Sequence, residues 1–227
     1  MKSPRIIGHR GASGHIAENT LASFKKAFEL GAHGIELDVH LSADGQVLVL
    51  HDDTLDRTTN GSGLVNHCHL SDAKKLLIDK IHPIPTLEEV FNECTNDVLI
   101  NVEIKDAKAT EAVVQLISAQ IKSGKHYSNF LVSSFDWSVL ELIKTINEQI
   151  PLGVLTEKNM EQAVLMGHTI QAKSIHPNFR NLDNENAQFI KENGFEIHTW
   201  TVNEPADIER MKALKVDAII SDFPDRI

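Results

Sequence analysis

Acidic side chains alternate with apolar ones in two short segments that have the composition of β-strands. Glu36 and Asp38 flank a leucine, and Glu103 and Lys105 flank an isoleucine. Successive side chains of a strand point to opposite faces, so the outer residues of each triplet share one face. Three carboxylates on the inside of a sheet repel one another and lose hydration, and this cost calls for a compensating charge. A divalent cation would supply it, and carboxylates without a nearby cysteine favour Mg2+ or Ca2+ over zinc.

Two histidines and two cations add proton-transfer and anion-binding groups to these acids. His9 and His51 each end a strand-like segment, where imidazoles suit a general acid and a general base on opposite sides of a reacting phosphorus or carbonyl centre. Arg10 offers a planar fork for phosphate oxygens, and Lys105 adds a point charge. The set indicates phosphate ester chemistry. The alternative is a purely structural ion network, in which Glu36 or Asp38 pairs with Arg10 or Lys105.

Short apolar strands alternate with amphipathic helical stretches nearly from end to end, a pattern typical of a parallel α/β fold. The expected strands are 5–8, 34–40, 98–105, 130–134, 152–155, 173–176, 196–202 and 217–221. Eight strand–helix units favour a (β/α)8 TIM barrel, so we expect one barrel domain over residues 1–227. An open doubly wound sheet also alternates, but it usually has a Gly-rich phosphate turn after its first strand, and Gly8-His9-Arg10-Gly11 lacks that pattern.

A long interruption follows the second expected strand. The turn Asp44-Gly45 and a strand over 47–51 predict a hairpin, and a polar segment over about 52–85 follows it. We interpret this segment as a small insertion at the second βα connection. Active sites of barrels lie at the carboxyl ends of the strands, so we expect the polar residues there to form the site: His9, Arg10, Glu36, Asp38, Glu103, Lys105 and Trp200.

Composition excludes several other classes of protein. With 22 Lys and Arg against 32 Asp and Glu, the net charge is -10, which argues against nucleic acid or anionic membrane as a partner. Cys68 and Cys94 form no CxxC pair, and Cys94 falls on the apolar face of an expected helix. The first residues contain no apolar run long enough for a signal peptide or membrane span. We therefore expect a cytoplasmic protein without stable membrane insertion; the pattern carries no indication of oligomeric state.

Several other residues receive a structural interpretation. His67, Cys68 and His69 lack the spacing of a tetrahedral metal site, so a loop role is favoured. His176 ends an expected strand and either borders the pocket or packs. Trp200 is favoured as an apolar wall for the substrate.

A set of motifs in this order resembles the glycerophosphodiester phosphodiesterase family. The motifs span the chain: Gly8-His9-Arg10-Gly11-Ala12, Glu18-Asn19-Thr20, Glu36-Leu37-Asp38-Val39, Asp44-Gly45, His51-Asp52, Ile84-Pro85-Thr86-Leu87, Asn101-Val102-Glu103-Ile104-Lys105, Trp200-Thr201-Val202-Asn203 and Asp217-Ala218-Ile219-Ile220-Ser221-Asp222. One departure is Ala17, where a proline commonly precedes the Glu-Asn-Thr motif.

The resemblance implies a TIM barrel that hydrolyses glycerophosphodiesters, such as glycerophosphocholine or glycerophosphoethanolamine, to sn-glycerol 3-phosphate and an alcohol. The implied roles are metal binding by Glu36, Asp38 and Glu103, acid/base catalysis by His9 and His51, phosphate binding by Arg10 and Lys105, and pocket lining by Asn19 and Trp200. Which histidine is the base stays open, as does the nucleophile, which is water or the glycerol hydroxyl of the substrate.

Two rival functions remain. A lysophospholipase D would use the same metal and histidines on lysophospholipids, but it needs an apolar groove, and the insertion is polar. A non-catalytic barrel that binds phosphorylated ligands needs no proton carriers, so His9 and His51 argue against it.

Overall fold

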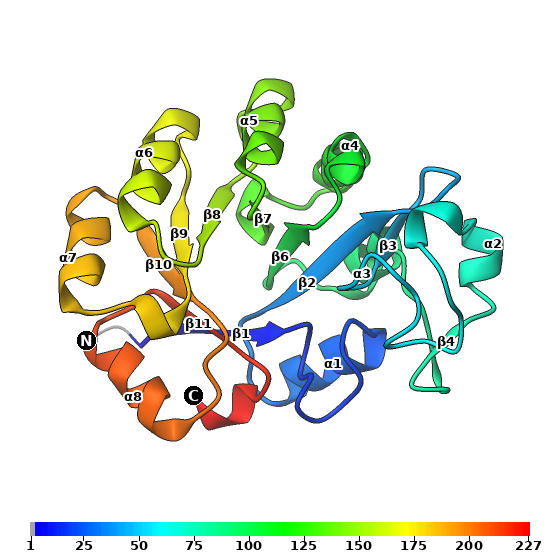
Figure 1. The fold of residues 1–227 in the computed structure, drawn as a ribbon, viewed down its shortest axis with the longest axis horizontal. Helices are drawn as coiled ribbons and strands as arrows, with labels where there is room; N and C mark the ends of the chain where they lie inside the picture. Colours follow the sequence, from blue (N-terminus) through cyan, green and yellow to red (C-terminus); the bar gives the residue numbers. More distant parts are fainter. Residues whose placement is uncertain (1–2) are drawn as a thin grey trace.

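Parallel strands close into a barrel in the computed structural model, which describes residues 3–227 (Figure 1). Within that range eight of them form the ring: β1 (Arg5–His9), β2 (Gly34–Leu41), β6 (Leu99–Ile104), β7 (Phe130–Ser134), β8 (Leu152–Thr156), β9 (Ser174–Pro177), β10 (Glu196–Thr199) and β11 (Ala218–Ser221). Strand β1 pairs with both β2 and β11, which closes the ring. The predicted (β/α)8 TIM barrel is thereby confirmed.

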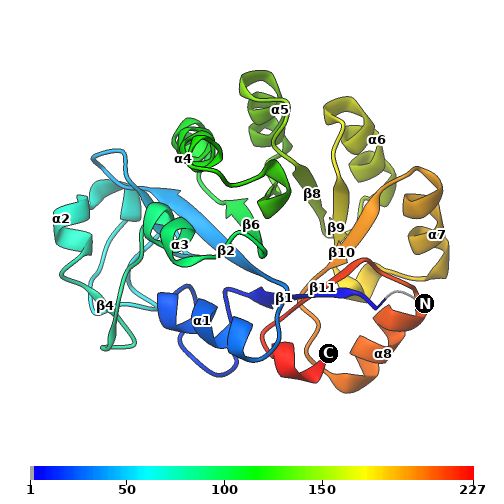
Figure 2. The same cartoon turned by 180° about the vertical axis from the view of Figure 1, so that it is seen from behind.

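Helices surround the ring of strands, as Figures 1 and 2 show from opposite sides. They are α1 (Leu21–Glu29), α3 (Leu87–Glu93), α4 (Thr110–Lys122), α5 (Trp137–Ile146), α6 (Met160–Ile170), α7 (Asn184–Glu192) and α8 (Pro205–Ala213). Helix α3 starts in the capping box expected from sequence, in which Thr86 and Glu89 satisfy each other's backbone N–H groups. The last strand differs from expectation, because in the described residues the 3-10 helix Pro224–Arg226 follows it instead of an α-helix.

Side chains fill the barrel and separate its packed interior from the pocket. Apolar residues of four strands form one buried cluster: Ile7, Leu99, Leu131, Ala218 and Ile220. The buried His176 and His198 stack beside them with ring centroids 4.9 Å apart, and the Ser174 hydroxyl lies 2.8 Å from His176 Nε2. His176 therefore packs inside the barrel and does not border the pocket.

The insertion lies to one side of the barrel, beside β2 and α3 (Figure 1). The strand that leads into it, β3 (Val47–Val49), pairs antiparallel with β2, which confirms the hairpin. Short elements follow: the 3-10 helix Val65–His67, α2 (Leu70–Ala73), β4 (Leu77–Ile78) and β5 (His82–Pro83). Although its composition is polar, the insertion packs on an apolar cluster that was not expected from the sequence. The cluster consists of Leu48, Leu50, Leu55, Val65, Ala73, Ile78 and Ile84. Because Leu48 and Leu50 belong to it, the cluster fixes the segment that leads into His51.

Cys94 is buried as expected, whereas His67 and His69 are exposed and Cys68 is half-buried. In residues 3–227, no helix has the length and apolarity needed to cross a bilayer.

Candidate active site

A pocket opens at the carboxyl ends of the barrel strands. Its walls are His9, Arg10, Glu36, His51, Asn101, Glu103, Lys105, Phe135, Leu155, Trp200, Thr201 and Ile220. The fold thus brings together residues from β1, β2, the insertion and β6, although His9 and Lys105 are far apart in sequence. Asp38 and Asn19 lie immediately behind this surface, both buried.

The three expected metal ligands form a tight carboxylate group. Glu36, Asp38 and Glu103 each offer an oxygen within 4.8 Å of the others. One oxygen of Glu36 accepts a bond of 3.0 Å from the Arg10 backbone N–H. The other, Oε1, is buried without a hydrogen-bond partner among residues 3–227. Burial, together with the charges of Asp38 and Glu103, raises the pKa of Glu36 to about 8. The group therefore lacks positive charge at its centre, which suits a divalent cation with oxygen ligands.

The ion network considered as an alternative is present but incomplete. Arg10 Nε lies 3.3 Å from Asp38 Oδ2, and Lys105 Nζ lies 2.9 Å from Glu103 Oε1. These contacts leave Glu36 Oε1 unsatisfied. Arg10 Nε is likewise buried without a hydrogen bond in the described residues. An orphaned acceptor on Glu36 and an orphaned donor on Arg10, two residues that line one pocket, fit a site for both a cation and an anionic group.

His9 is held by an aspartate from the opposite end of the chain. Its Nδ1 lies 2.6 Å from Asp222 Oδ1, and Asp222 also accepts hydrogen bonds from Ser13 Oγ and Asn203 Nδ2. Burial disfavours the charged imidazole, but the Asp222 bond and the charge of Glu36 outweigh it, so the pKa of His9 is raised. Burial also opposes ionisation of Asp222, yet its hydrogen bonds lower the pKa of that carboxyl to about 2.

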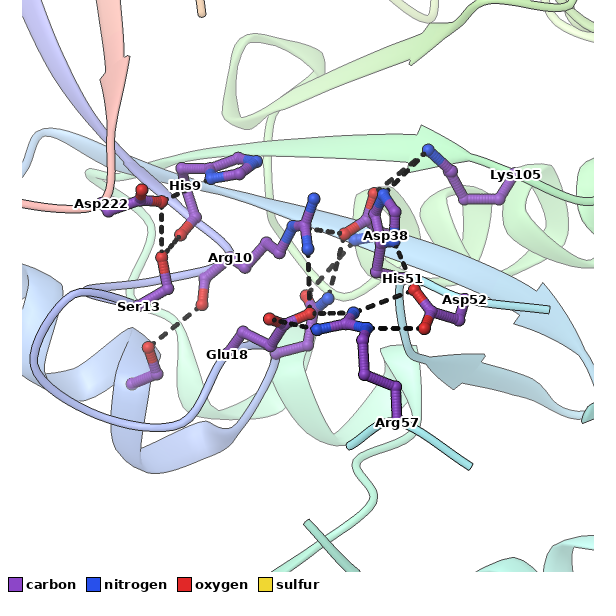
Figure 3. Close-up of polar contacts among 12 residues, drawn as sticks. His9, Arg10, Ser13, Glu18, Asp38, His51, Asp52, Arg57, Lys105 and Asp222 are labelled. Carbon is purple, nitrogen blue, oxygen red and sulfur yellow. Dashed lines mark hydrogen bonds and ion pairs between the residues drawn. The ribbon is translucent and has the colours of Figure 1, made fainter. Parts of the chain in front are cut away.

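His51 has a similar carboxylate partner but the opposite electrostatic balance. Its Nδ1 lies 2.7 Å from Asp52 Oδ1, and its Nε2 lies 3.4 Å from Lys105 Nζ. Burial lowers the pKa of His51, and the charges of Arg10 and Lys105 lower it further. Asp38 and Asp52 raise it, but by less, so the pKa of His51 is lowered. Because an ammonium group can only donate, the Lys105 contact requires a free electron pair on Nε2 of a neutral ring. Figure 3 shows Arg10 between the two histidines in this view.

The loop after β1 has strained backbone that is tied down by hydrogen bonds. Arg10 has φ 52 and Asn19 has φ 56, both in the left-handed region. The Arg10 carbonyl accepts from Asn19 N–H at 3.0 Å and from Ser23 Oγ at 3.0 Å. Asn19 Nδ2 donates to Asp38 Oδ2 at 3.0 Å. Asn19 is buried behind the pocket lining that the resemblance implied for it, and its contact with Asp38 favours a role in orienting that carboxylate.

An aromatic wall closes the side of the pocket opposite the insertion. Trp200 directly follows β10, and its Nε1 donates to the His176 carbonyl at 2.9 Å. Phe135 packs edge-on against it with ring centroids 5.5 Å apart. The expected placement of Trp200 at the mouth agrees with this geometry, while Phe135 was not anticipated.

Sequence reasoning assigned no role to the carboxylates that hold the two histidines. Asp222 and Asp52 both stand in quoted motifs, and each directly follows a strand end, a signal that could have found them. Asn101 precedes Glu103 by two residues, so strand alternation places it on the same face. Glu18 and Arg57 lie in loops, where no periodicity marks them.

A closed barrel with acids, histidines and cations gathered at the carboxyl ends of its strands is the architecture of a TIM-barrel enzyme. Residues 9–226 match the model of the glycerophosphoryl diester phosphodiesterase family. A glycerophosphodiester phosphodiesterase of Caldanaerobacter subterraneus subsp. tengcongensis is 39% identical, covering 98% of this chain and 95% of the relative. One from Bacillus altitudinis is 36% identical, covering 98% and 96%.

Solved structures agree with these relatives. A phosphodiesterase of Oleispira antarctica, in complex with the product sn-glycerol-3-phosphate, superposes with a TM-score of 0.91 at 28% identity, covering 99% of this chain and 95% of that one. The glycerophosphodiester phosphodiesterase of Thermotoga maritima gives a TM-score of 0.83 at 32% identity, covering 99% and 97%. The chain belongs to the glycerophosphodiester phosphodiesterase family, whose members are phosphoric diester hydrolases.

Proposed function

We propose that the chain hydrolyses glycerophosphodiesters, such as glycerophosphocholine or glycerophosphoethanolamine, to sn-glycerol 3-phosphate and an alcohol, in a reaction that depends on a divalent cation and two histidines. The observation that carries the proposal is the pair of carboxylate-backed imidazoles, His9 and His51, in one pocket with three acids and two cations. The product bound to the Oleispira antarctica relative supports the same substrate class.

Glu36, Asp38 and Glu103 would hold the cation, Mg2+ or Ca2+. When bound there, it would neutralise charge on a phosphoryl oxygen as the transition state develops. The unsatisfied Glu36 Oε1 and the raised pKa of Glu36 support this assignment. Arg10 and Lys105 would bind the remaining phosphate oxygens, since both cations line the pocket beside the acids.

The histidines divide the proton transfers between them. His51, whose environment favours the neutral ring, would accept the proton of the nucleophile through Nε2. His9, whose environment favours the charged ring, would protonate the leaving alkoxide through its own Nε2. A bond forms between the nucleophile and phosphorus, and the bond from phosphorus to the leaving alcohol breaks. The nucleophile is water or the neighbouring glycerol hydroxyl; the second route passes through a cyclic phosphate.

The aromatic wall gives one observation in favour of a lysophospholipase D activity as the second candidate. Phe135, a residue that lines the pocket, is 43% exposed and could contact an acyl chain. The insertion on the other side exposes mainly polar side chains, which favours the small, water-soluble diester.

Release of glycerol 3-phosphate from glycerophosphocholine tests the proposal, with lysophosphatidylcholine and choline release as the parallel assay. His51→Ala should lower turnover of glycerophosphocholine by roughly 100- to 10,000-fold. His67→Ala, which removes an exposed histidine of the same insertion, should leave it unchanged. Wild-type turnover in the His51→Ala variant would remove His51 from the mechanism, and faster turnover of lysophosphatidylcholine would favour the second candidate.

A further inference from the structure

Arg57, in the insertion, joins two carboxylates that contact adjacent edges of its guanidinium group. Nε and Nη2 donate to the two oxygens of Asp52 at 2.6 and 2.9 Å. Nη1 and Nη2 donate to the two oxygens of Glu18 at 3.0 and 2.7 Å. Each contact is bidentate, a geometry that a planar guanidinium can form and an ammonium cannot.

Each of these carboxylates in turn holds a residue of the candidate site. Asp52 Oδ1 lies 2.7 Å from His51 Nδ1. Glu18 Oε1 accepts a bond of 2.9 Å from Arg10 Nη1. Figure 3 shows the resulting chain, which runs from His51 through Asp52, Arg57 and Glu18 to Arg10. The insertion and the loop after β1 are thereby connected through one side chain.

The positive charge of Arg57 stabilises the two carboxylates that it joins. Asp52 and Glu18 both lie close to Arg57, and without it they would repel each other. Its hydrogen bonds hold the pKa of Asp52 well below its usual range. Burial opposes ionisation of Glu18, but Arg57 and Arg10 together lower its pKa. With Asp52 ionised, His51 carries its proton on Nδ1 and keeps the Nε2 electron pair directed at Lys105.

The position of Arg57 argues against a mainly structural role. Its side chain is 47% exposed, so it adds little to the packed core, and water screens its charge. It does not line the pocket, so direct contact with substrate is not its function either. The bidentate contacts instead constrain the orientation of the groups they join.

We propose that Arg57 is a positioning residue for the reaction: through Asp52 it fixes the orientation and tautomer of His51, and through Glu18 it fixes the guanidinium of Arg10. This inference rests on the proposed function, because it assigns Arg57 to the base and to the phosphate-binding group of that reaction. It predicts that loss of Arg57 affects kcat through His51 and KM through Arg10.

The test compares Arg57→Ala with Lys75→Ala, which removes an exposed cation of the same insertion from a surface pair with Asp72. For glycerophosphocholine in saturating divalent cation, Arg57→Ala should lower kcat by about 10- to 100-fold, as loss of an orienting partner typically does, and should raise KM. Lys75→Ala should match the wild type.

Added guanidinium ion should restore part of the kcat of Arg57→Ala and none of that of His51→Ala. Arg57→Lys should retain only part of the activity.

Two further measurements separate positioning from a general loss of structure. In a double-mutant cycle, Arg57→Ala should change kcat little in an Asp52→Asn background and KM little in a Glu18→Gln background. The 15N shifts of the His51 ring should show one tautomer in the wild type and a mixture in Arg57→Ala. Kinetic constants of Arg57→Ala within twofold of the wild type would overturn the inference, as would additive cycles or an unchanged His51 tautomer. A wild-type protein without diesterase activity would instead contradict the proposed function.

Discussion

His9 and His51 have opposite electrostatic environments although an aspartate contacts Nδ1 of each ring. The bond to Asp222 and the charge of Glu36 favour the protonated form of His9 against the effect of burial. Burial and two cations favour the neutral form of His51. The two imidazoles have the same ordinary pKa, and their surroundings shift it upward for His9 and downward for His51. A general acid and a general base that work near neutral pH require such opposite shifts.

Asp222→Asn tests the role of the carboxylate behind His9. The amide would present an N–H group or a weaker acceptor to Nδ1 and would favour the wrong tautomer, so kcat should fall by roughly 100- to 10,000-fold. Asp225→Asn is the matched control, because Asp225 makes a similar 2.7 Å contact with His15 at the surface. Steady-state rates of glycerol 3-phosphate release measure both variants. Equal rates for Asp222→Asn and the control would contradict the role of Asp222.

At the scale of elements, the loop between β1 and α1 depends on a glycine that no larger residue can replace. Gly11 has φ 84, and a Cβ there would lie 2.6 Å from the backbone carbon of Ser23 in α1. Gly31, after the same helix, has φ 89 with open space around it. The two positions therefore share the backbone strain of a left-handed conformation and differ in the steric clash.

Gly11→Ala should lower the free energy of unfolding by about 2 kcal/mol or more, whereas Gly31→Ala should cost about 1 kcal/mol from strain alone. Gly11→Ala should also reduce diesterase activity, because the loop carries Arg10 and Asn19. Urea titrations followed by circular dichroism give both free energies. A smaller loss for Gly11→Ala than for Gly31→Ala would contradict the close approach of the loop to α1.

The elements were largely predictable because their signals are local. Strand alternation placed Glu36, Asp38 and Glu103 on one face, and the capping box located the start of α3. The pairing of His9 with Asp222 was not predictable by such reasoning, because the residues are 213 positions apart and meet only when β1 and β11 close the barrel. The role of Arg57 was also hidden, because its partners lie on two loops whose conformations have no sequence period.

At the scale of the whole molecule, the barrel interior contains ionisable groups that the proposed reaction does not use. His176 and His198 are buried, and burial lowers the pKa of both, that of His176 well below its ordinary value of 6.5. The unfolded chain binds protons on these histidines below about pH 6.5, whereas the folded chain binds them only at lower pH. Their contribution to stability is therefore full above pH 6.5 and is lost as the pH falls.

His176→Gln isolates this effect, because Glu36 and His9 have raised pKa values and act in the opposite direction in both proteins. Between pH 7.5 and 5.5, the wild type should lose up to about 1.4 kcal/mol relative to the variant, which corresponds to one histidine protonated only when unfolded. Urea titrations at the two pH values measure the difference. A constant gap between the two proteins would contradict a neutral His176 in the fold.

The central claim is that three barrel carboxylates hold a divalent cation that is required for hydrolysis of a glycerophosphodiester. Its most direct test is the rate of sn-glycerol 3-phosphate release from glycerophosphocholine by chelator-treated protein during a titration with Mg2+ or Ca2+. We predict that chelation abolishes turnover and that one of the ions restores it saturably, with no restoration in Glu36→Gln. Turnover that persists undiminished after thorough chelation would contradict the account.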